Sequence, residues 1–281
     1  MFRFQTFPPS RALREYLYCY LISDVIDDND LSIEHEALPM GITTICFSDI
    51  TASYFNRTVS DQRYSLAPDI ALVGQMVQKG ESIFCRPFRS VIALFKSTGI
   101  FQLSGIPMNI ITGRHSTDAT AVFSPKEFRE CREQMFQHND PIKIVNVLDN
   151  FLWSKFKSRK SDVRNLDKLA EVINQNMGNV NLNWLTDQTN MSIKTLERHF
   201  TEKIGLTPKY FARIIRFRNA LQLLENKGRQ TDVIKVVEAC GYTDQAHLIK
   251  EFRHFSNRTP KFYYANEDIL SPFFLKSMTE K

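Results

Sequence analysis

Residues 239–252 read Ala239-Cys-Gly-Tyr-Thr-Asp-Gln-Ala-His-Leu-Ile-Lys-Glu-Phe252 and contain one break in a helical pattern. Gly241 favours the left-handed backbone that a tight turn between two helices requires. Asp244 suits the start of the second helix, because its side-chain oxygens can accept hydrogen bonds from the free amides of the first turn. Leu248 and Phe252 are then four residues apart, the spacing of apolar residues on one face of a helix. The stretch therefore predicts a helix-turn-helix unit.

The same pattern occurs a second time about 52 residues earlier in the chain. Thr207-Pro-Lys-Tyr-Phe211 corresponds to Thr259-Pro-Lys-Phe-Tyr263 at that spacing. In the earlier copy, Asn190 stands at the turn and Ser192 at the start of the second helix. Chance does not readily supply the Thr-Pro-Lys-aromatic-aromatic string as well as the apolar matches. We therefore interpret this region as a duplication that forms two helix-turn-helix units.

A single long helix is expected between the two units. Thr207-Pro208 is a good helix start and Gly228 a good stop, so the helix should have about 20 residues and a length of roughly 30 Å. Successive major grooves on one side of B-DNA lie about 34 Å apart. Arg213, Arg216 and Arg218 on this helix could contact phosphates or form an ordinary solvated basic face. The spacing allows the two recognition helices to enter adjacent major grooves.

Each recognition helix is predicted to have an apolar face and a polar face. The residues expected to pack inward are Ile193, Leu196 and Phe200 in the first helix and Leu248, Phe252 and Phe255 in the second. The residues expected to face DNA are Lys194, Glu197, Arg198 and Thr201 in the first helix and Gln245, Ala246, Ile249, Lys250 and Arg253 in the second. An exposed isoleucine between Gln245 and Lys250 suits a major groove, where an apolar side chain can contact a thymine methyl group. For either helix alone, an ordinary amphipathic surface helix is the better explanation of the pattern. Two such helices in a duplicated frame favour DNA reading instead.

The residues before this region predict a different kind of domain. The runs 16–22, 42–47 and 90–95 are short and rich in β-branched and aromatic residues, as strands are. Residues 124–156 change to a helical period and indicate a helical hairpin. We therefore expect an α+β chain of two domains: a β-rich, barrel-like domain over 1–156 and an all-α domain over 165–265. A basic linker, 157–164, and a C-terminal tail, 266–281, complete the division.

The charge distribution favours contact with a polyanion at the rear of the chain only. The first 154 residues carry 14 Lys and Arg against 17 Asp and Glu, residues 155–164 carry 5 against 1, and residues 165–264 carry 15 against 10. No run of about 18 apolar residues predicts a membrane span, and no secretory signal is evident. Five scattered cysteines without a C-x-x-C motif indicate reduced thiols in the cytoplasm.

The stretch 239–252, together with Thr259-Pro260 and Tyr263, resembles the signature of the AraC family of bacterial transcription regulators. The resemblance covers residues 165–265 and implies two helix-turn-helix units that bind double-stranded DNA. It implies base contacts by residues already placed on the polar faces: Lys194, Glu197, Arg198, Gln245, Ala246, Ile249 and Lys250. Two departures stand out: Ser256 at the turn where the family usually has glycine, and Lys250 for the commoner arginine, which loses a bidentate fork.

The N-terminal half resembles the β-rich sensor domain of one branch of the same family. The resemblance lies in residues 95–107, although Ser97-Thr98 replace the expected proline before Gly99. An acidic domain rich in Tyr, Phe and Ile, attached to a basic DNA reader, has no evident role except to bias that reader, so we expect it to bind a small-molecule effector that controls transcription, as in an activator. RNA polymerase and a second copy of the chain are further expected partners. Sensing of a protein or peptide is the alternative for this domain. An architectural DNA binder without an effector is a further alternative.

The sensor has few candidate residues in the sequence. Tyr16, Tyr18, Tyr20 and Phe47 could line an apolar pocket or simply form the core. The hairpin residues Ile144, Val147, Leu148, Phe151 and Leu152 could form a self-association surface or pack onto their own sheet.

No catalytic, metal-binding or cofactor-binding pattern is found, so we expect no enzyme activity and no cofactor. The six histidines lack metal-ligand spacing, and His35-Glu36 is more simply a hydrogen-bonded pair than a catalytic base. A DNA alkyl-transfer protein is the competing enzyme class, because relatives of this family carry such an activity. Cys85, beside Arg86, would be its thiol.

Overall fold

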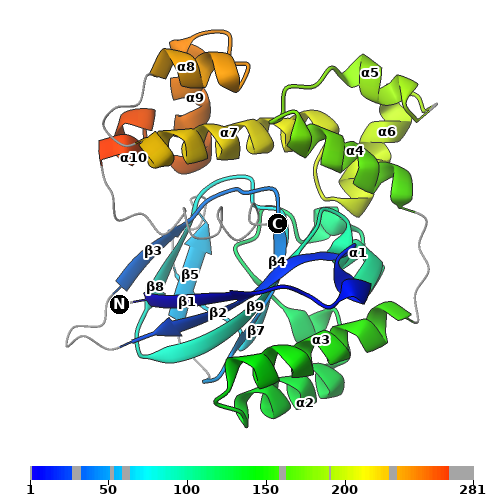
Figure 1. Ribbon diagram of the computed structural model, residues 1–281, viewed down its shortest axis with the longest axis vertical. Coiled ribbons are helices and arrows are strands. Elements are labelled where there is room, and N and C mark those ends of the chain that lie inside the picture. The colour runs from blue at the N-terminus through cyan, green and yellow to red at the C-terminus, as the bar shows by residue number, and fades with distance from the viewer. Residues whose placement is uncertain are drawn as a thin grey trace.

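The computed structural model describes residues 2–26, 33–50, 54–58, 64–157, 163–189, 191–227 and 233–265. Within them, a β-rich N-terminal part and a helical C-terminal part lie against each other (Figure 1). Most of the expected linker 157–164, the tail 266–281, Asn190 and Gly228 lie outside the described residues. No helix in the described ranges is both long and apolar enough to cross a membrane.

The described strands of the N-terminal part form two antiparallel sheets. The first has the order β1 (Phe2–Phe7), β2 (Leu17–Val25), β9 (Phe88–Phe95), β4 (Thr43–Ser48), β7 (Ile70–Val73) and β10 (Thr117–Asp118). The second has the order β3 (Ile33–Ala37), β8 (Gly80–Phe84), β5 (Tyr54–Thr58) and β6 (Ser65–Leu66). The three strands predicted from sequence become β2, β4 and β9, the centre of the first sheet. The β-rich expectation is confirmed, with two separate sheets in place of one closed barrel.

The first sheet has an apolar face that packs against helices. Side chains alternate between the two faces of a strand, and Ile45, Phe47, Val91 and Phe95 share one of them, fully buried. That face is covered by α1 (Gly99–Ser104), α2 (Pro125–Phe136) and α3 (Pro141–Lys157), together with the short turns η1 (Arg11–Leu13), η2 (Met108–Ile110) and η3 (Ala119–Ala121). The predicted helical hairpin 124–156 is thus present as α2 and α3.

The four aromatic residues considered for a pocket do not share one. Tyr20 and Phe47 are fully buried in the core beneath the helices, whereas Tyr16 stacks on the ring of Phe156 at 4.0 Å. Tyr18 falls at a register shift between β2 and β9, where the pairing passes from Leu17 directly to Cys19. Such a bulge interrupts the alternation of side chains between the two faces of a strand. The prediction that Tyr18 shares a face with Tyr20 assumed an uninterrupted alternation and was therefore wrong.

The hairpin α2–α3 buries most of the apolar side chains that could have formed a self-association surface. Ile144, Leu148 and Leu152 are fully buried, and Val147 and Phe151 pack half-buried against the same core. They pack onto their own domain, as the simpler alternative predicted.

The C-terminal part consists of helices around one apolar core. They are α4 (Arg164–Gln175), α5 (Leu182–Asp187), α6 (Ile193–Lys203), α7 (Pro208–Lys227), α8 (Val233–Ala239), α9 (Gln245–Ser256) and α10 (Pro260–Ala265). Phe211, Phe217 and Leu221 of α7 are fully buried at the centre of this core. The expected spacer helix is confirmed and has 20 residues.

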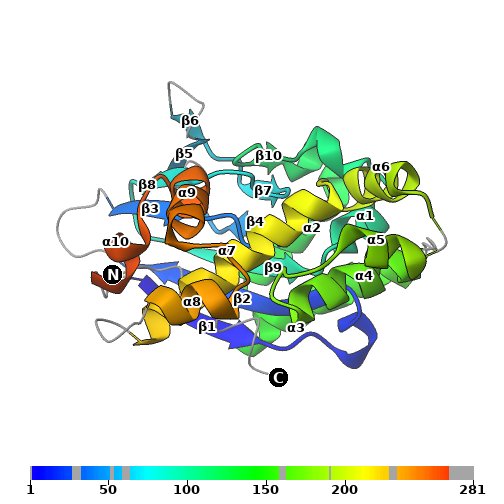
Figure 2. The same ribbon diagram turned by 90° about the horizontal axis from the view of Figure 1, so that it is seen from above.

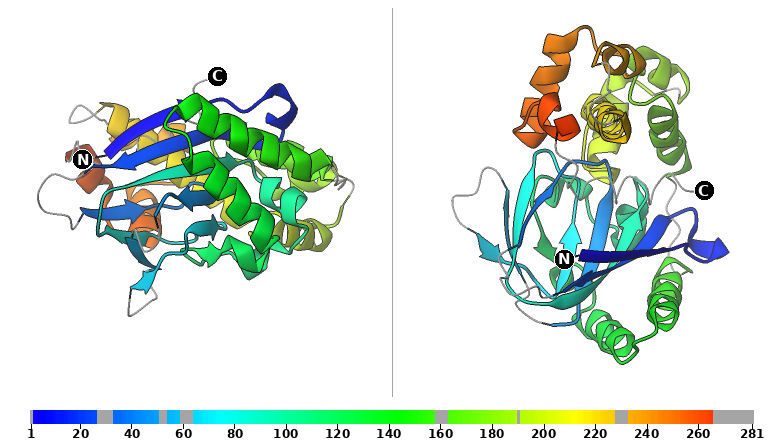
Figure 3. Two further views of the ribbon diagram at one scale, coloured as in Figure 1. Left: turned by 90° about the horizontal axis from the view of Figure 1, so that it is seen from below. Right: turned by 60° about the vertical axis from the view of Figure 1, so that its left-hand side comes forward.

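The helical part docks on one end of the two sheets, and the α2–α3 hairpin covers the other end (Figure 3). The segment 38–42 between β3 and β4 enters the helical core, where Leu38 and Met40 are more than nine-tenths buried. A Cβ on Gly41 would lie 2.6 Å from Cδ1 of Ile215, so this segment, which we call the docking loop, lies directly against α7.

Candidate nucleic-acid interface

The first helix-turn-helix unit consists of α5 and α6. The hydroxyl of Ser192 accepts a hydrogen bond from the backbone N–H of Thr195 at 3.2 Å and so caps α6, as predicted. Leu196 and Phe200 are buried and fix the helix on the core. Ile193, predicted to pack inward, is 46% exposed, because it stands in the first turn, where the helix end projects beyond the core.

The second unit consists of α8 and α9 and follows the predicted outline closely. Gly241 has φ +67°, the left-handed turn conformation expected of it. A carboxylate oxygen of Asp244 accepts a hydrogen bond from the N–H of His247 at 2.7 Å and caps α9. Leu248 and Phe252 are fully buried, whereas Ile249 is 36% exposed, as expected of a residue on the reading face.

The two recognition helices lie toward opposite ends of α7 and on the same side of it (Figure 2). On α9, all five residues predicted to face DNA are exposed: Gln245, Ala246, Ile249, Lys250 and Arg253. On α6, Lys194 and Arg198 are exposed and Glu197 and Thr201 are half-buried. The four α6 residues share a shallow hollow, to which the N-terminal part contributes Asn109 of η2. No local sequence signal points to Asn109, because 85 residues separate it from Lys194.

The arginines of α7 do not form a phosphate-binding face. Arg213 makes two hydrogen bonds, of 3.0 and 2.8 Å, to the buried carboxylate of Glu251 on α9. Arg216 donates to the carbonyl oxygen of Gly178, and Arg218 donates to the carbonyl oxygen of Met40 in the docking loop and to the side chain of Asn174. The expectation of phosphate contacts was wrong, because the core of the chain uses these guanidinium groups as internal hydrogen-bond donors.

The turn after α9 has its left-handed residue one position after Ser256, at the same place in the repeat as in the first unit. Ser256 is still helical and its hydroxyl donates to the carbonyl oxygen of Phe252. The left-handed residue is Asn257, at φ +55°, which corresponds to Gly205, at φ +98°, in the earlier copy. Asparagine tolerates this conformation better than most residues, so Asn257 takes the place of the glycine.

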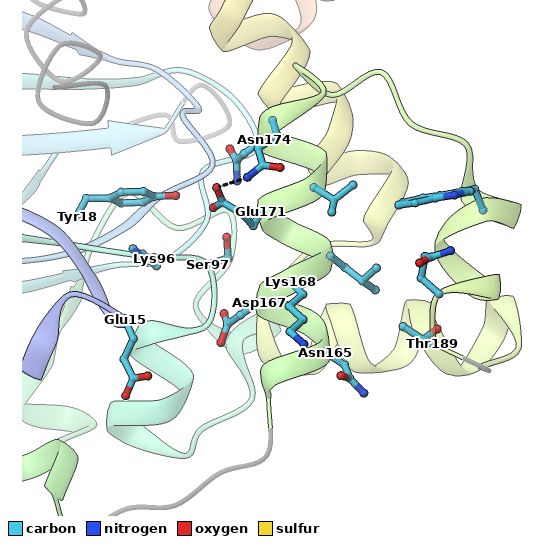
Figure 4. Close-up of a pocket in the computed structure, with 15 residues that line it drawn as sticks. Glu15, Tyr18, Lys96, Ser97, Asn165, Asp167, Lys168, Glu171, Asn174 and Thr189 are labelled. Atoms are coloured by element: carbon cyan, nitrogen blue, oxygen red, sulfur yellow. Dashed lines mark hydrogen bonds between the residues drawn. The ribbon is translucent and has the colours of Figure 1, made fainter. Parts of the chain in front are cut away.

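An open cleft of about 890 Å³ separates α4 and α5 from the N-terminal part. Figure 4 shows Glu15, Tyr18 and Lys96 on one side of it and Asp167, Glu171 and Asn174 on α4. The hydroxyl of Thr98 donates to a carboxylate oxygen of Asp167, one of the lining residues, at 2.6 Å. Burial raises the pKa of Asp167, and the hydrogen bond from Thr98 opposes that shift. Thr98, which departs from the family motif, therefore joins the two parts of the chain.

The residues considered for catalysis make ordinary structural contacts. Cys85 is exposed, and its thiol donates to the carbonyl oxygen of Ile83 at 3.6 Å. Glu36 is ion-paired with Lys79 at 2.8 Å and with Arg258 at 3.2 Å. In the described part of the chain, no three His, Cys, Asp or Glu side chains gather as metal ligands would.

Comparison with known proteins finds two family models along the chain. Residues 185–266 match a helix-turn-helix domain, and residues 5–117 match a domain of unknown function. Among curated proteins, the transcriptional activator RhaS of Pectobacterium atrosepticum is 33% identical over 93 residues, which cover 31% of each chain. RhaS of Escherichia coli O1:K1 is 28% identical over 138 residues, 46% of this chain and 49% of the relative. This chain thus matches less than half the length of these relatives.

Among solved structures, ToxT from Vibrio cholerae O395 aligns over 99% of both chains, with 12% identity and a TM-score of 0.47. The matched helix-turn-helix model, over residues 185–266, contains both recognition helices. Through residues 185–266, the chain is similar to helix-turn-helix proteins such as the RhaS transcriptional activators.

Proposed function

We propose that this chain is a sequence-specific DNA-binding transcription regulator that inserts α6 and α9 into adjacent major grooves of double-stranded DNA. The observation that carries the proposal is the pair of capped recognition helices at the two ends of the 20-residue helix α7. A helix of that length spans about 30 Å, close to the roughly 34 Å between successive major grooves on one side of B-DNA.

The base-contacting residues are proposed from the two exposed faces. The first set is Lys194, Glu197, Arg198 and Thr201, and the second is Gln245, Ala246, Ile249, Lys250 and Arg253. Arg198 has the fork that reads guanine, and Gln245 has the amide that pairs with adenine. Ile249 offers an apolar contact to a thymine methyl group. Lys250 acts as a point charge with less directional preference than arginine.

We further propose the division of labour between the two parts. Residues 165–265 read DNA, and residues 1–156 take a small-molecule effector that biases the reader. The contacts of the docking loop, Thr98 and Glu36 with the helical part support this, since an effector must act through a physical connection. The RhaS relatives are named transcriptional activators, and on that ground RNA polymerase is a proposed partner in the bacterial cytoplasm. A second copy of the chain also remains a proposed partner.

The test is selection of binding sequences from a random duplex library with the full chain. The selected site should contain two short elements whose centres lie about 10 base pairs apart, one for each recognition helix. Affinity for this site should fall steeply with salt, because lysines and arginines release counterions from the phosphates that they contact. Failure to enrich any sequence, or enrichment of a single short element, would contradict two-groove reading.

A further inference from the structure

Two adjoining, partly open cavities of about 150 and 140 Å³ lie between the two sheets of the N-terminal part. The cavities share the walls formed by His35, Ala37, Thr44, Val73 and His115. Together they approach the lower limit of about 300 Å³ that is typical of small-molecule sites. They lie on the opposite face of the first sheet from the apolar core beneath α1, α2 and α3.

The sequence of the first sheet explains why space remains here. Ser23 on β2, Thr44 and Cys46 on β4, and Ser90 on β9 point to the cavity, and Tyr20, Ile45, Phe47 and Val91 point away from it. Ser23 and Ser90 face each other directly across the pairing of β2 with β9. Protein interiors are normally filled to the density of organic crystals, so a row of small polar side chains opposite a second sheet leaves a defined space.

The lining of the larger cavity is mainly apolar, with a few polar side chains, and contains no Asp, Glu, Lys or Arg. The amide of Asn56 donates to the hydroxyl of Ser116 at 2.9 Å, and the hydroxyl of Ser82 lies 3.1 Å from Nε2 of His115. Phe84 and Phe88 add two stacked rings, with 5.5 Å between their centroids. The site therefore offers neutral hydrogen-bonding groups and aromatic surface.

The charges around the two cavities disfavour an ionised ligand. Burial lowers the pKa of His35 to about 4; the nearby His115 adds to this shift and Glu36 opposes it. His35 is therefore neutral near pH 7. The single carboxylate that lines the smaller cavity, that of Glu36, is already paired with Lys79 and Arg258. A buried anion or cation without a compensating charge is strongly disfavoured.

We propose that this inter-sheet cavity binds an uncharged, partly aromatic small molecule that carries hydroxyl or amide groups. The proposal deepens the effector role in the proposed function and rests on it. Its physical link to the DNA reader is the docking loop, because Leu38, Met40 and Ile42 line the smaller cavity and also pack against the core around α7. A ligand there contacts the same side chains that hold the helical part, and so favours one arrangement of the docking loop on α7.

The test uses the thiol of Cys46, which lines the larger cavity, in the full chain. Cys85 is exposed and serves as an internal positive control, whereas Cys19, Cys131 and Cys240 are buried. The probes are methyl methanethiosulfonate, which is neutral, and its anionic sulfonatoethyl analogue, with modification mapped by mass spectrometry of peptides. We expect the neutral reagent to modify Cys46 and Cys85 and the anionic reagent to modify Cys85 alone.

A second arm tests occupancy with two molecules of nearly equal shape. Benzamide, which is neutral, should slow the modification of Cys46 several-fold without affecting Cys85, and benzoate should slow neither. Ser90→Leu, which fills the cavity, should abolish the protection by benzamide, and Ser154→Leu on the exposed face of α3 should preserve it.

Three results would overturn the proposal: modification of Cys46 by the anionic reagent as fast as Cys85, no modification of Cys46 by the neutral reagent, or equal protection by benzoate and benzamide. DNA binding is measured on the same preparations. Loss of selectivity for neutral molecules with intact DNA binding would reject the cavity proposal alone. Selective protection in a chain that binds no DNA would instead reject the regulator function and with it the effector role.

Discussion

The ion pair of Arg213 with Glu251 joins α7 to α9 inside the helical part. Glu251 is 4% exposed, and the guanidinium of Arg213 also lies over the rings of Tyr210 and Phe255. Arg213→Ala would leave a buried carboxylate without its partner. We expect destabilisation by about 2 kcal/mol, less than the roughly 3–5 kcal/mol of a fully buried pair because the Arg213 side chain retains 31% exposure. Urea denaturation measures this loss, with Arg253→Ala on the exposed face of α9 as a nearly neutral control.

Arg198 and Lys250, which we propose contact bases, carry a prediction about specificity. Each substitution by alanine should cost about 1–3 kcal/mol at the selected DNA site and much less on random DNA, since removal of a base contact affects only the cognate sequence. Binding titrations on both duplexes at one salt concentration measure the difference. Lys126→Ala, on the far hairpin α2–α3, is the matched control. An equal loss on both duplexes would make these residues phosphate contacts.

His35 makes the stability of the N-terminal part depend on pH. Its pKa is lowered to about 4 by burial, with His115 adding to that effect and Glu36 opposing it, from an ordinary value of 6.5. Between these values the unfolded chain binds more protons than the folded chain, so the contribution of His35 is complete above pH 6.5 and is lost as pH falls toward 4. The denaturation midpoint should therefore fall between pH 7.5 and pH 5, and it should fall less in His35→Asn than in the natural chain. His138→Asn is the control and should behave like the natural chain. Equal differences in all three would contradict a buried neutral imidazole.

Among the elements, α6 is held at its C-terminal end by the N-terminal part. A Cβ on Gly205 would lie 2.2 Å from the hydroxyl oxygen of Thr112, which itself donates to the carbonyl oxygen of Met108. Gly205→Ala should therefore separate α6 from η2 and increase the radius of gyration in solution scattering. Gly113→Ala, where φ is also positive but the Cβ would make only an ordinary van der Waals contact with Cγ2 of Val77 at 3.4 Å, controls for backbone strain alone. Thr112→Ala combined with Gly205→Ala should restore docking, and no restoration would place the cause in the backbone.

The elements of the DNA reader could be predicted from the sequence because their signals are local. Ser192 and Asp244 cap helices through amides three residues away, and the apolar period that buries Leu196 and Leu248 repeats within two turns. Local signals also set the limit of such predictions. Period alone could not show that Ile193 extends beyond the core or that a bulge removes Tyr18 from its expected face.

For the molecule as a whole, the contact between the two parts was beyond sequence reasoning. Thr98 donates a hydrogen bond to Asp167, and Arg218 donates one to Met40. Both pairs are too far apart in the sequence for a periodic pattern to predict their contact. A basic residue on a spacer helix is usually solvated and so available to a phosphate, which is why the sequence suggested a phosphate contact for Arg218. Its hydrogen-bond partners, Met40 and Asn174, depend on the packing of the docking loop and α4 against α7.

The internal hydrogen bonds of Arg218 lead to a prediction that separates the two interpretations. If Arg218 bound a phosphate, Arg218→Ala would reduce the slope of log affinity against log salt by about 0.9, in line with counterion release. We expect instead an unchanged slope together with looser docking of the two parts, detected as a lower melting temperature and a larger radius of gyration. Lys209→Ala, an exposed substitution on the same helix, is the control. A reduced slope with unchanged compactness would restore the phosphate interpretation.

The division of the first sheet into two faces has a consequence for how this protein can diversify. Ile45, Phe47 and Val91 maintain the core on one face, whereas Thr44, Cys46 and Ser90 shape the cavity on the other. Because neighbouring positions on a strand face opposite ways, selection can alter the cavity without disturbing the packing beneath the helices. Descendants of this sequence could thus acquire new ligand preferences through a few small-to-small exchanges, while inheriting the same reader and the same foldability.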